Sequence, residues 1–117
     1  MVRDTLSIFA EVITRILCHR QSVRDEKMIH RHILKLNERF AGEVLKGRKR
    51  FEVRFNDHCF QRGDEVKFRI VDDYGGPVKN EIAEELEGRL YRITFVVSGY
   101  GLKEGYVAFG FEEIEEN

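Results

Sequence analysis

A short stretch near the middle of the chain combines the side chains best suited to recognising a ligand. Lys49, Glu52 and Arg54 follow the turn residue Gly47 and supply an ammonium, a carboxylate and a guanidinium. An ammonium attracts phosphate as a point charge, whereas the planar guanidinium fits a phosphate or a base edge. The carboxylate can accept a hydrogen bond from an exocyclic amine, and Asn56 can both donate and accept. These residue types predict a site for an anionic or nucleobase ligand.

Neighbouring residues extend the predicted site. Arg48 and Arg50 can attract phosphate without reading a base sequence. The ring of Tyr100, or alternatively of Tyr74 or Tyr106, can stack on an unstacked base. We therefore predict that RNA or a nucleotide is bound by Arg48, Lys49, Arg50, Glu52, Arg54, Asn56, Asp57 and Tyr100.

The predicted site stands on a β-strand. Apolar and polar side chains alternate over residues 51–56, and successive side chains of a strand point to opposite faces. We expect the polar set to face a cleft and the core to take up the apolar set, which is Phe51, Val53 and Phe55. The alternative is an ion pair between Glu52 and Arg54 that only tethers a neighbouring strand.

Charge is distributed unevenly along the chain, although the net charge is only −1. Residues 30–69 carry eleven Lys or Arg and six Asp or Glu, whereas residues 72–117 carry four and eleven. The basic block contains the predicted site, which favours an anionic partner there. The alternative is that the two blocks pair with each other in the fold and cancel.

The remaining sequence predicts a mainly β domain with some α-helix. One helix is expected over residues 38–46, and residues 81–86 are compatible with one helical turn or with an exposed loop. Further strands are expected over residues 32–36, 65–71, 90–97 and 106–114. Short strands with glycine turns favour a small barrel of about five strands. We expect its core to contain Phe51, Val53, Phe55, Phe68, Ile70, Ile93, Phe95 and Phe109.

The first part of the chain predicts a separate amphipathic helix. It covers residues 4–19 and is followed by a polar linker, so residues 1–28 form one segment and residues 29–117 one domain. The apolar stripe of this helix needs a partner surface, either the domain or a second copy of the chain. A homodimer through residues 4–19 is therefore one alternative, and with it a role as a protein-interaction or regulatory module.

Length and composition indicate the number of domains and the cellular compartment. A chain of 117 residues is long enough for one domain with its own core. Cys18 and Cys59 form no CxxC pattern, which favours a reducing compartment, although a single disulfide between them stays open. Apolar runs are too short for a membrane span, so we expect a cytoplasmic protein without membrane contact.

The motif Gly47-x-Lys49-x-x-Glu52-x-Arg54 resembles the signature of ASCH domains, which belong to the PUA-like superfamily of RNA-associated β-barrels. The similarity extends over residues 29–114 and looks like a bacterial and phage subgroup of that superfamily. It rests on His32-x-Leu34-Lys35, Asn56-Asp57, Gly63-Asp64, Gly88-Arg89 and Gly101-Leu102-x-x-Gly105-Tyr106. The resemblance implies a PUA-like barrel in which residues 47–57 line a cleft for RNA or a modified nucleobase.

Hydrolysis is a different class of function. Some ASCH proteins look like small amidohydrolases that act on acylated cytidine-type nucleosides through a lysine, a threonine and a glutamate. Lys49 matches the lysine and Glu104 is a loose counterpart of the glutamate, but Glu52 stands at the threonine position and removes the hydroxyl nucleophile. We therefore expect no catalytic residue and no cofactor.

A zinc site is the remaining alternative. Asp57, His58 and Cys59 are consecutive, and His30 and His32 precede them in the chain. Their spacing fits no standard zinc site, because structural zinc ligands come in regularly spaced pairs. We expect a polar loop there and no bound metal.

Overall fold

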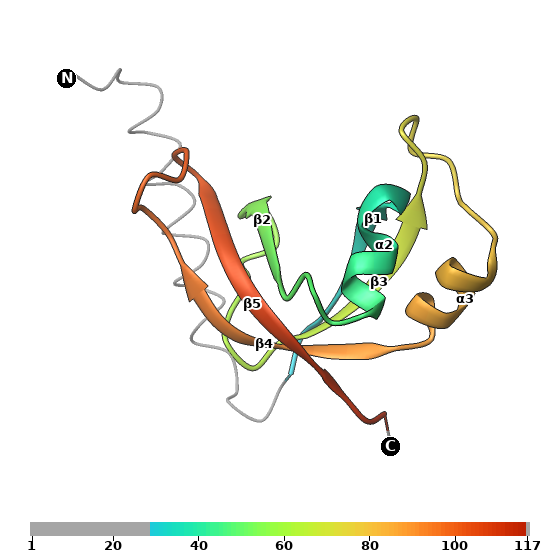
Figure 1. Ribbon diagram of the computed structural model, residues 1–117. Coiled ribbons are helices and arrows are strands. Elements are labelled where there is room, and N and C mark those ends of the chain that lie inside the picture. The colour runs from blue at the N-terminus through green and yellow to red at the C-terminus, as the bar shows by residue number, and fades with distance from the viewer. Residues whose placement is uncertain (1–28, 117) are drawn as a thin grey trace.

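The computed structural model describes residues 29–116, which form one five-stranded mixed sheet and two helices (Figure 1). The elements are β1 (Arg31–Asn37), α2 (Glu38–Leu45), β2 (Phe51–Phe55), β3 (Glu65–Val71), α3 (Glu81–Glu87), β4 (Leu90–Val97) and β5 (Tyr106–Ile114). The strands lie in the order β1-β3-β4-β5-β2, and the sheet curls into a half-barrel whose edges are β1 and β2. The expected mainly β architecture of five strands is confirmed.

The core begins where β1 and β3 pair in parallel. Leu34 lies opposite Phe68 and Leu36 opposite Ile70, and all four side chains are buried. Because a tight turn cannot join parallel neighbours, α2, β2 and a loop form the connection between these two strands. The core continues on the antiparallel strands with Tyr91, Ile93, Val107, Phe109 and Phe111.

Both helices begin at asparagine caps and pack against each other. Asn37 Oδ1 accepts a hydrogen bond from the backbone N–H of Arg39, and Asn80 Oδ1 accepts one from Ala83, each at 2.9 Å. Such caps satisfy N–H groups that a helix start leaves unpaired. α3 buries Ala83 and Leu86, so this segment is a packed helix and not an exposed loop.

The structure corrects the expected orientation of β2. Glu52 points to the inner side, where only 5% of the residue is exposed, and its Cα partner is the buried Phe109. Alternation puts the polar and apolar sets on opposite faces but does not decide which face is inner. As an edge strand, β2 borders a groove with its inner face, so polar groups can lie there. The apolar set lies outward and is 48% to 55% exposed: Phe51, Val53 and Phe55.

A β-bulge in β4 corrects a second expectation. Ile93 pairs with Phe111 and Phe95 with Gly110, so Thr94 is the extra residue. One extra residue reverses the alternation, and Phe95 therefore leaves the core face and is 63% exposed. The other residues expected in the core are buried: Phe68, Ile70, Ile93 and Phe109.

The described strands form half of a barrel, whereas a small barrel of about five strands was expected. Across residues 29–116, no backbone ladder joins β1 to β2. The predicted helix over residues 4–19, the homodimer through it and the Cys18 side of the disulfide alternative lie outside the described residues. Neither of the two described helices has the length and apolar character needed to cross a membrane.

Candidate functional site

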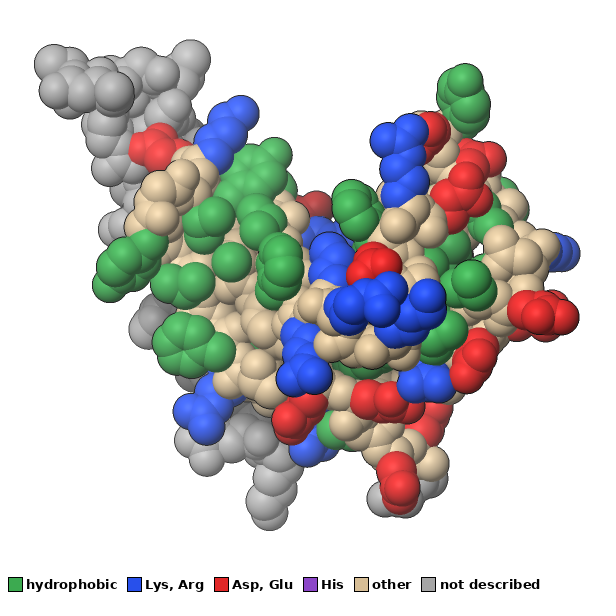
Figure 2. Space-filling model, viewed as in Figure 1, with side chains coloured by type: hydrophobic (Ala, Val, Ile, Leu, Met, Phe, Trp, Pro, Cys, Tyr) green, Lys and Arg blue, Asp and Glu red, His purple; other side chains and the backbone are tan. Residues whose placement is uncertain are grey.

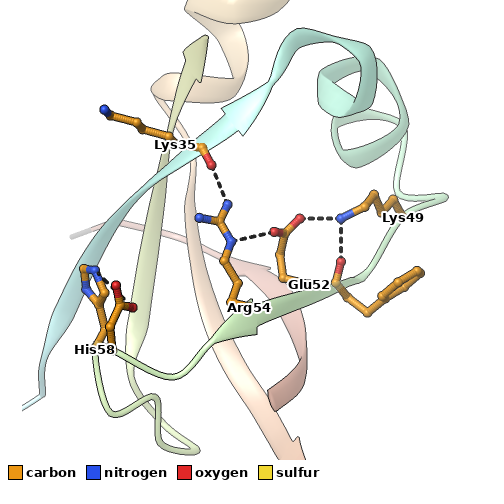
Figure 3. A network of polar contacts seen from close by, with 7 residues as sticks. Lys35, Lys49, Glu52, Arg54 and His58 are labelled. Atoms are coloured by element: carbon orange, nitrogen blue, oxygen red, sulfur yellow. Dashed lines mark hydrogen bonds and ion pairs between the residues drawn. The ribbon is translucent and has the colours of Figure 1, made fainter. Parts of the chain in front are cut away.

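Three of the charged side chains predicted from the sequence meet on the inner side of β2 (Figure 3). The Glu52 carboxylate accepts a hydrogen bond from Lys49 Nζ through Oε1 and one from Arg54 Nε through Oε2, the latter at 2.9 Å. Glu52 is buried, whereas both cations keep part of their side chains in solvent. A carboxylate shielded from water needs such partners, because a buried unpaired charge is costly. With two cations and one carboxylate, the cluster carries one excess positive charge.

Lys49 reaches this cluster because it precedes the strand instead of belonging to it. Gly47 ends the turn of α2 with a φ of 77°, a conformation that glycine adopts without strain. The backbone N–H of Lys49 donates to Glu43 O at 3.0 Å, and its Nζ donates to Phe51 O at 2.7 Å. Strict alternation would place Lys49 and Glu52 on opposite faces, and this turn brings them together.

Arg54 connects the two edges of the half-barrel. Its Nη2 donates to the Lys35 backbone oxygen on β1 at 2.5 Å while its Nε binds Glu52. The side chain of Lys35 points away from the cluster, so β1 contributes a carbonyl oxygen and not a charge (Figure 3). The alternative prediction, an ion pair between Glu52 and Arg54 that tethers a neighbouring strand, is therefore matched by the contact from Arg54 to β1. This contact lies beside a groove.

This groove has a volume of about 410 Å³ and opens between β2 and the region where β1 meets α2; we call it the β1–β2 groove. Two rings, Phe40 and Phe51, flank Lys49, whose Nζ lies 5.4 Å and 5.0 Å from the ring centres. A cation at such distances is attracted to the ring face. The groove thus combines flat apolar surfaces with a charged cluster. It is lined by Leu36, Asn37, Phe40, Lys49, Phe51, Glu52, Val53 and Arg54.

Three other predicted site residues lie away from the β1–β2 groove. Arg48 donates two hydrogen bonds to Glu43, at 2.6 Å and 2.8 Å, and this contact holds the pKa of the Glu43 carboxyl below its usual range. Arg50 donates to Gly47 O at 2.7 Å and borders a smaller hollow of about 190 Å³. Tyr100 is 95% exposed on the loop between β4 and β5.

Asn56 and Asp57 belong to the loop after β2. Asn56 Oδ1 accepts a hydrogen bond from the Phe60 backbone at 3.0 Å, and the Asn56 N–H donates to Gly105 O at 2.8 Å. Asp57 is exposed, and its Oδ1 lies 3.7 Å from His58 Nε2. Asn56 therefore positions a loop, and the structure does not bring either residue to the groove lining.

A second buried polar pair connects β1 to the turn before β3. His32 Nε2 lies 2.8 Å from Asp64 Oδ2, and both side chains are buried. The same carboxylate accepts a hydrogen bond from the Gln61 backbone at 3.2 Å, so this pair holds the turn in place. The His58 ring lies 5.7 Å from the His32 ring. In the part of the chain that the structure describes, no three His, Cys, Asp or Glu side chains converge as metal ligands.

The two charge blocks pair with each other only in part. Arg39 contacts Asp73 at 2.6 Å, and Lys67 contacts Glu116 at 3.2 Å. Among residues 29–116, however, two cations of the loop before β2 form no close ion pair: Lys46, which only helps to lower the pKa of the Glu43 carboxyl, and Arg50. The loop before β2 therefore keeps an excess of positive charge.

Sequence reasoning missed part of the groove lining. Phe40 has the spacing of the apolar stripe of α2, yet it is about half exposed and lines the groove, whereas Ala41 and Val44 are buried. One signal for Phe40 was available in the sequence: the apolar stripe of α2 is wider than the face that a short helix buries, so one of its residues could be expected at the surface. Lys35 contributes a backbone oxygen, which no pattern of side chains reveals.

Comparison with known proteins assigns the chain to a family. No curated protein matches it at a significant level. The profile of a family described as "Domain of unknown function (DUF3850)" matches residues 31–111, which extend from β1 into β5 and include the whole groove lining. Since this match covers more than half of its length, the chain belongs to the DUF3850 family.

Proposed function

We propose that the chain binds RNA or a nucleotide in the β1–β2 groove. The observation that carries this proposal is the convergence of Lys49, Glu52 and Arg54 on a groove otherwise lined mainly by apolar and aromatic side chains. Sites for small ligands have this composition, because apolar walls supply burial and a few polar groups fix orientation. The groove volume of about 410 Å³ lies within the usual range of about 300–1,000 Å³.

The residues of the groove take distinct roles in this proposal. Phe40 and Phe51 offer ring faces on which a base can stack. Lys49 attracts a phosphate, while Glu52 orients both cations and can accept a hydrogen bond from a base amine. Arg54 Nη1 has no hydrogen-bond partner within residues 29–116, so it can donate to a phosphate or a base edge.

The resemblance to ASCH domains supports the same class of ligand. In that family the G-x-K-x-x-E-x-R motif is associated with a cleft in a PUA-like barrel. In this chain, Lys49, Glu52 and Arg54 of the motif border a groove in a half-barrel. Membership of the PUA-like superfamily is therefore part of the proposal, by analogy of motif and not by the fold alone.

Hydrolysis is not part of the proposal. The described residues that line the groove carry no hydroxyl and no thiol, and Glu52 is engaged by both cations. A nucleophilic mechanism needs an activated hydroxyl, thiol or comparable group. We expect no turnover of acylated cytidine. A turnover that is lost in Lys49→Ala would contradict this expectation.

Binding measurements on two variants test the proposal. Calorimetric titrations with mononucleotides and with a single-stranded RNA of about 12 nucleotides would compare wild type, Lys49→Ala and Arg54→Ala. Lys49→Ala should weaken RNA binding and reduce the salt slope by about one counterion. Arg54→Ala should weaken binding by about 1–3 kcal/mol, because a planar multidentate contact is lost.

Lys79→Ala provides the matched control, since Lys79 is an exposed lysine that does not line the groove. This variant should bind like wild type, and melting temperatures of all three variants would establish that they are folded. The proposal fails if folded Lys49→Ala and Arg54→Ala bind nucleotides and RNA as well as wild type does.

A further inference from the structure

The outer face of β2, β5 and β4 exposes an unusual amount of apolar and aromatic surface. Phe51 lies opposite Gly110, which lies opposite Phe95, and Phe55 lies opposite Tyr106. Residues opposite each other in a sheet share a face, so these rings stand on one surface. Three of the rings, those of Phe51, Phe55 and Phe95, are between 48% and 63% exposed. An exposed apolar patch of this kind marks an interaction surface.

Cations border this outer face. Lys103 Nζ lies 5.9 Å from the centre of the Tyr106 ring, and Lys49 Nζ lies 5.0 Å from that of Phe51. The loop before β2 adds further positive charge at the edge of β2, because residues 46–50 contain four Lys or Arg and no Asp or Glu. Figure 2 shows hydrophobic side chains gathered over this arm of the half-barrel, with lysine and arginine side chains along its border.

Phe51 joins the outer face to the β1–β2 groove. Its backbone belongs to β2 and its face is the outer one, yet it also lines the groove beside Lys49. A ligand seated in the groove can therefore continue over the edge strand onto the outer face without crossing a polar barrier. A wholly apolar partner would leave Lys103 and the excess positive charge of the Lys49–Glu52–Arg54 cluster unmatched, whereas a polyanion with flat apolar faces matches both features.

We propose that the outer face of β2, β5 and β4 is a stacking platform for the unstacked bases of a single-stranded nucleic acid. The phosphates of the strand follow the basic loop before β2, and successive bases stack on Phe51 and Phe95. This inference rests on the proposed function of the groove and extends it, because the ligand becomes a single strand of several nucleotides. Stacking on rings tolerates any base, so the platform supplies affinity and the groove supplies selectivity.

Phe95→Leu tests the platform separately from the groove. Leucine keeps an apolar side chain but removes the ring, and Phe95 lies outside the core and outside the groove lining. Fluorescence anisotropy would use a labelled single-stranded RNA of about 12 nucleotides, the DNA of the same sequence and the matching blunt duplex. Calorimetry would follow the binding of uridine monophosphate to the groove, and Phe95→Tyr would keep a ring at the position.

Tyr74→Leu is the matched control, because Tyr74 is an even more exposed ring on the loop after β3 and away from the platform. Phe95→Leu should weaken binding of both single strands by about 5- to 100-fold, the effect of losing one base stack. Its mononucleotide affinity and melting temperature should match wild type. Phe95→Tyr should restore single-strand binding, Tyr74→Leu should change nothing, and the duplex should bind more weakly because its bases are paired.

Two results would overturn the platform. The first is unchanged single-strand affinity in Phe95→Leu while uridine monophosphate still binds, which leaves the groove proposal standing. The second is that sedimentation shows a wild-type dimer, and that Phe95→Asp dissociates this dimer without changing single-strand affinity. The outer face would then be an interface between two copies of the chain. If neither the mononucleotide nor the single strands bind the wild-type chain, the groove proposal and the platform fail together.

Discussion

Among single residues, Glu52 determines where the charges of the site can lie. Its carboxylate is buried, and it accepts hydrogen bonds from both Lys49 and Arg54. Each hydrogen bond that involves a charged group contributes about 1.5–3 kcal/mol. Because the two cations also reach solvent, they can be rehydrated when the carboxylate is removed, which limits the loss of stability.

We therefore predict that Glu52→Ala lowers the free energy of unfolding by about 2–3 kcal/mol. Urea denaturation measures this loss. Glu115→Ala is the control, because Glu115 is exposed after the last strand and its removal should stay within about 0.5 kcal/mol of wild type. Equal losses in the two variants would show that the buried cluster contributes nothing to stability.

Two glycines give a second prediction at this scale. Gly105 has a φ of 81°, and a Cβ there would lie 2.7 Å from Phe55 Cε2. Gly105→Ala should therefore cost at least about 1–2 kcal/mol of stability. Gly42 lies in α2 with no atom within 4 Å of a built Cβ, so Gly42→Ala should stabilise by about 0.5–1 kcal/mol. Thermal unfolding measures both changes. If the two variants shift the melting temperature in the same direction, this prediction is wrong.

Among the elements, α2 depends on a polar network at its first turn. Asn37 caps the helix, and its Nδ2 donates to Asp73 Oδ1 at 2.9 Å. This hydrogen bond and the neighbouring Arg39 guanidinium lower the pKa of the Asp73 carboxyl below its usual 3.8. The folded state therefore favours the ionised carboxylate, which links the loop after β3 to the helix cap.

The stability that Asp73 contributes should be present above its usual pKa and lost as the pH falls through the lower folded value. We predict that Asp73→Asn lowers the melting temperature at neutral pH. The difference between variant and wild type should shrink as the solution is acidified below about pH 4. Melting temperatures recorded across this range measure the effect. If the difference in melting temperature between Asp73→Asn and wild type does not change with pH, the carboxylate charge does not contribute to stability.

The strands show what the sequence could and could not predict. Alternation in β2 and β3 identified the strands and the residues that share a face, because side chains of a strand alternate strictly. It could not decide that Glu52 faces inward, because that depends on β2 lying at the sheet edge beside β1. Nor could it locate the bulge at Thr94 that turns Phe95 outward, since no residue type marks a bulge unambiguously.

The candidate site was predictable to a similar degree. Lys49, Glu52 and Arg54 are neighbours in the sequence, so their proximity follows from local geometry once the turn at Gly47 is known. Phe40 and the Lys35 carbonyl come from other elements and join the site only through tertiary folding. Arg48 and Tyr100 have suitable chemistry, but their positions in the fold keep them out of the groove lining.

At the scale of the whole molecule, the seam between β1 and β2 separates the half-barrel from a closed barrel. The backbones of Arg50 and Asn56 form hydrogen bonds with β5. In an antiparallel pair every second residue bonds to the neighbouring strand, so the backbones of Glu52 and Arg54 also face β5. The N–H groups of Val53 and Phe55 therefore point away from β5 and toward this seam. We predict that these two amides exchange with solvent much faster than the amide of Arg54, which faces β5. Hydrogen exchange followed by NMR measures the rates, and equal protection would indicate a paired seam.

The side-chain link from Arg54 to β1 has a mechanical consequence. A barrel closed by a ladder can widen only by breaking a row of backbone hydrogen bonds, whereas here the described contact across the seam is the bond from Arg54 Nη2 to Lys35 O. Releasing one such bond costs about 1.5–3 kcal/mol, a small part of the energy of a tight complex. The gap between β1 and β2 can therefore widen while the backbone pairing of the other strands keeps its register.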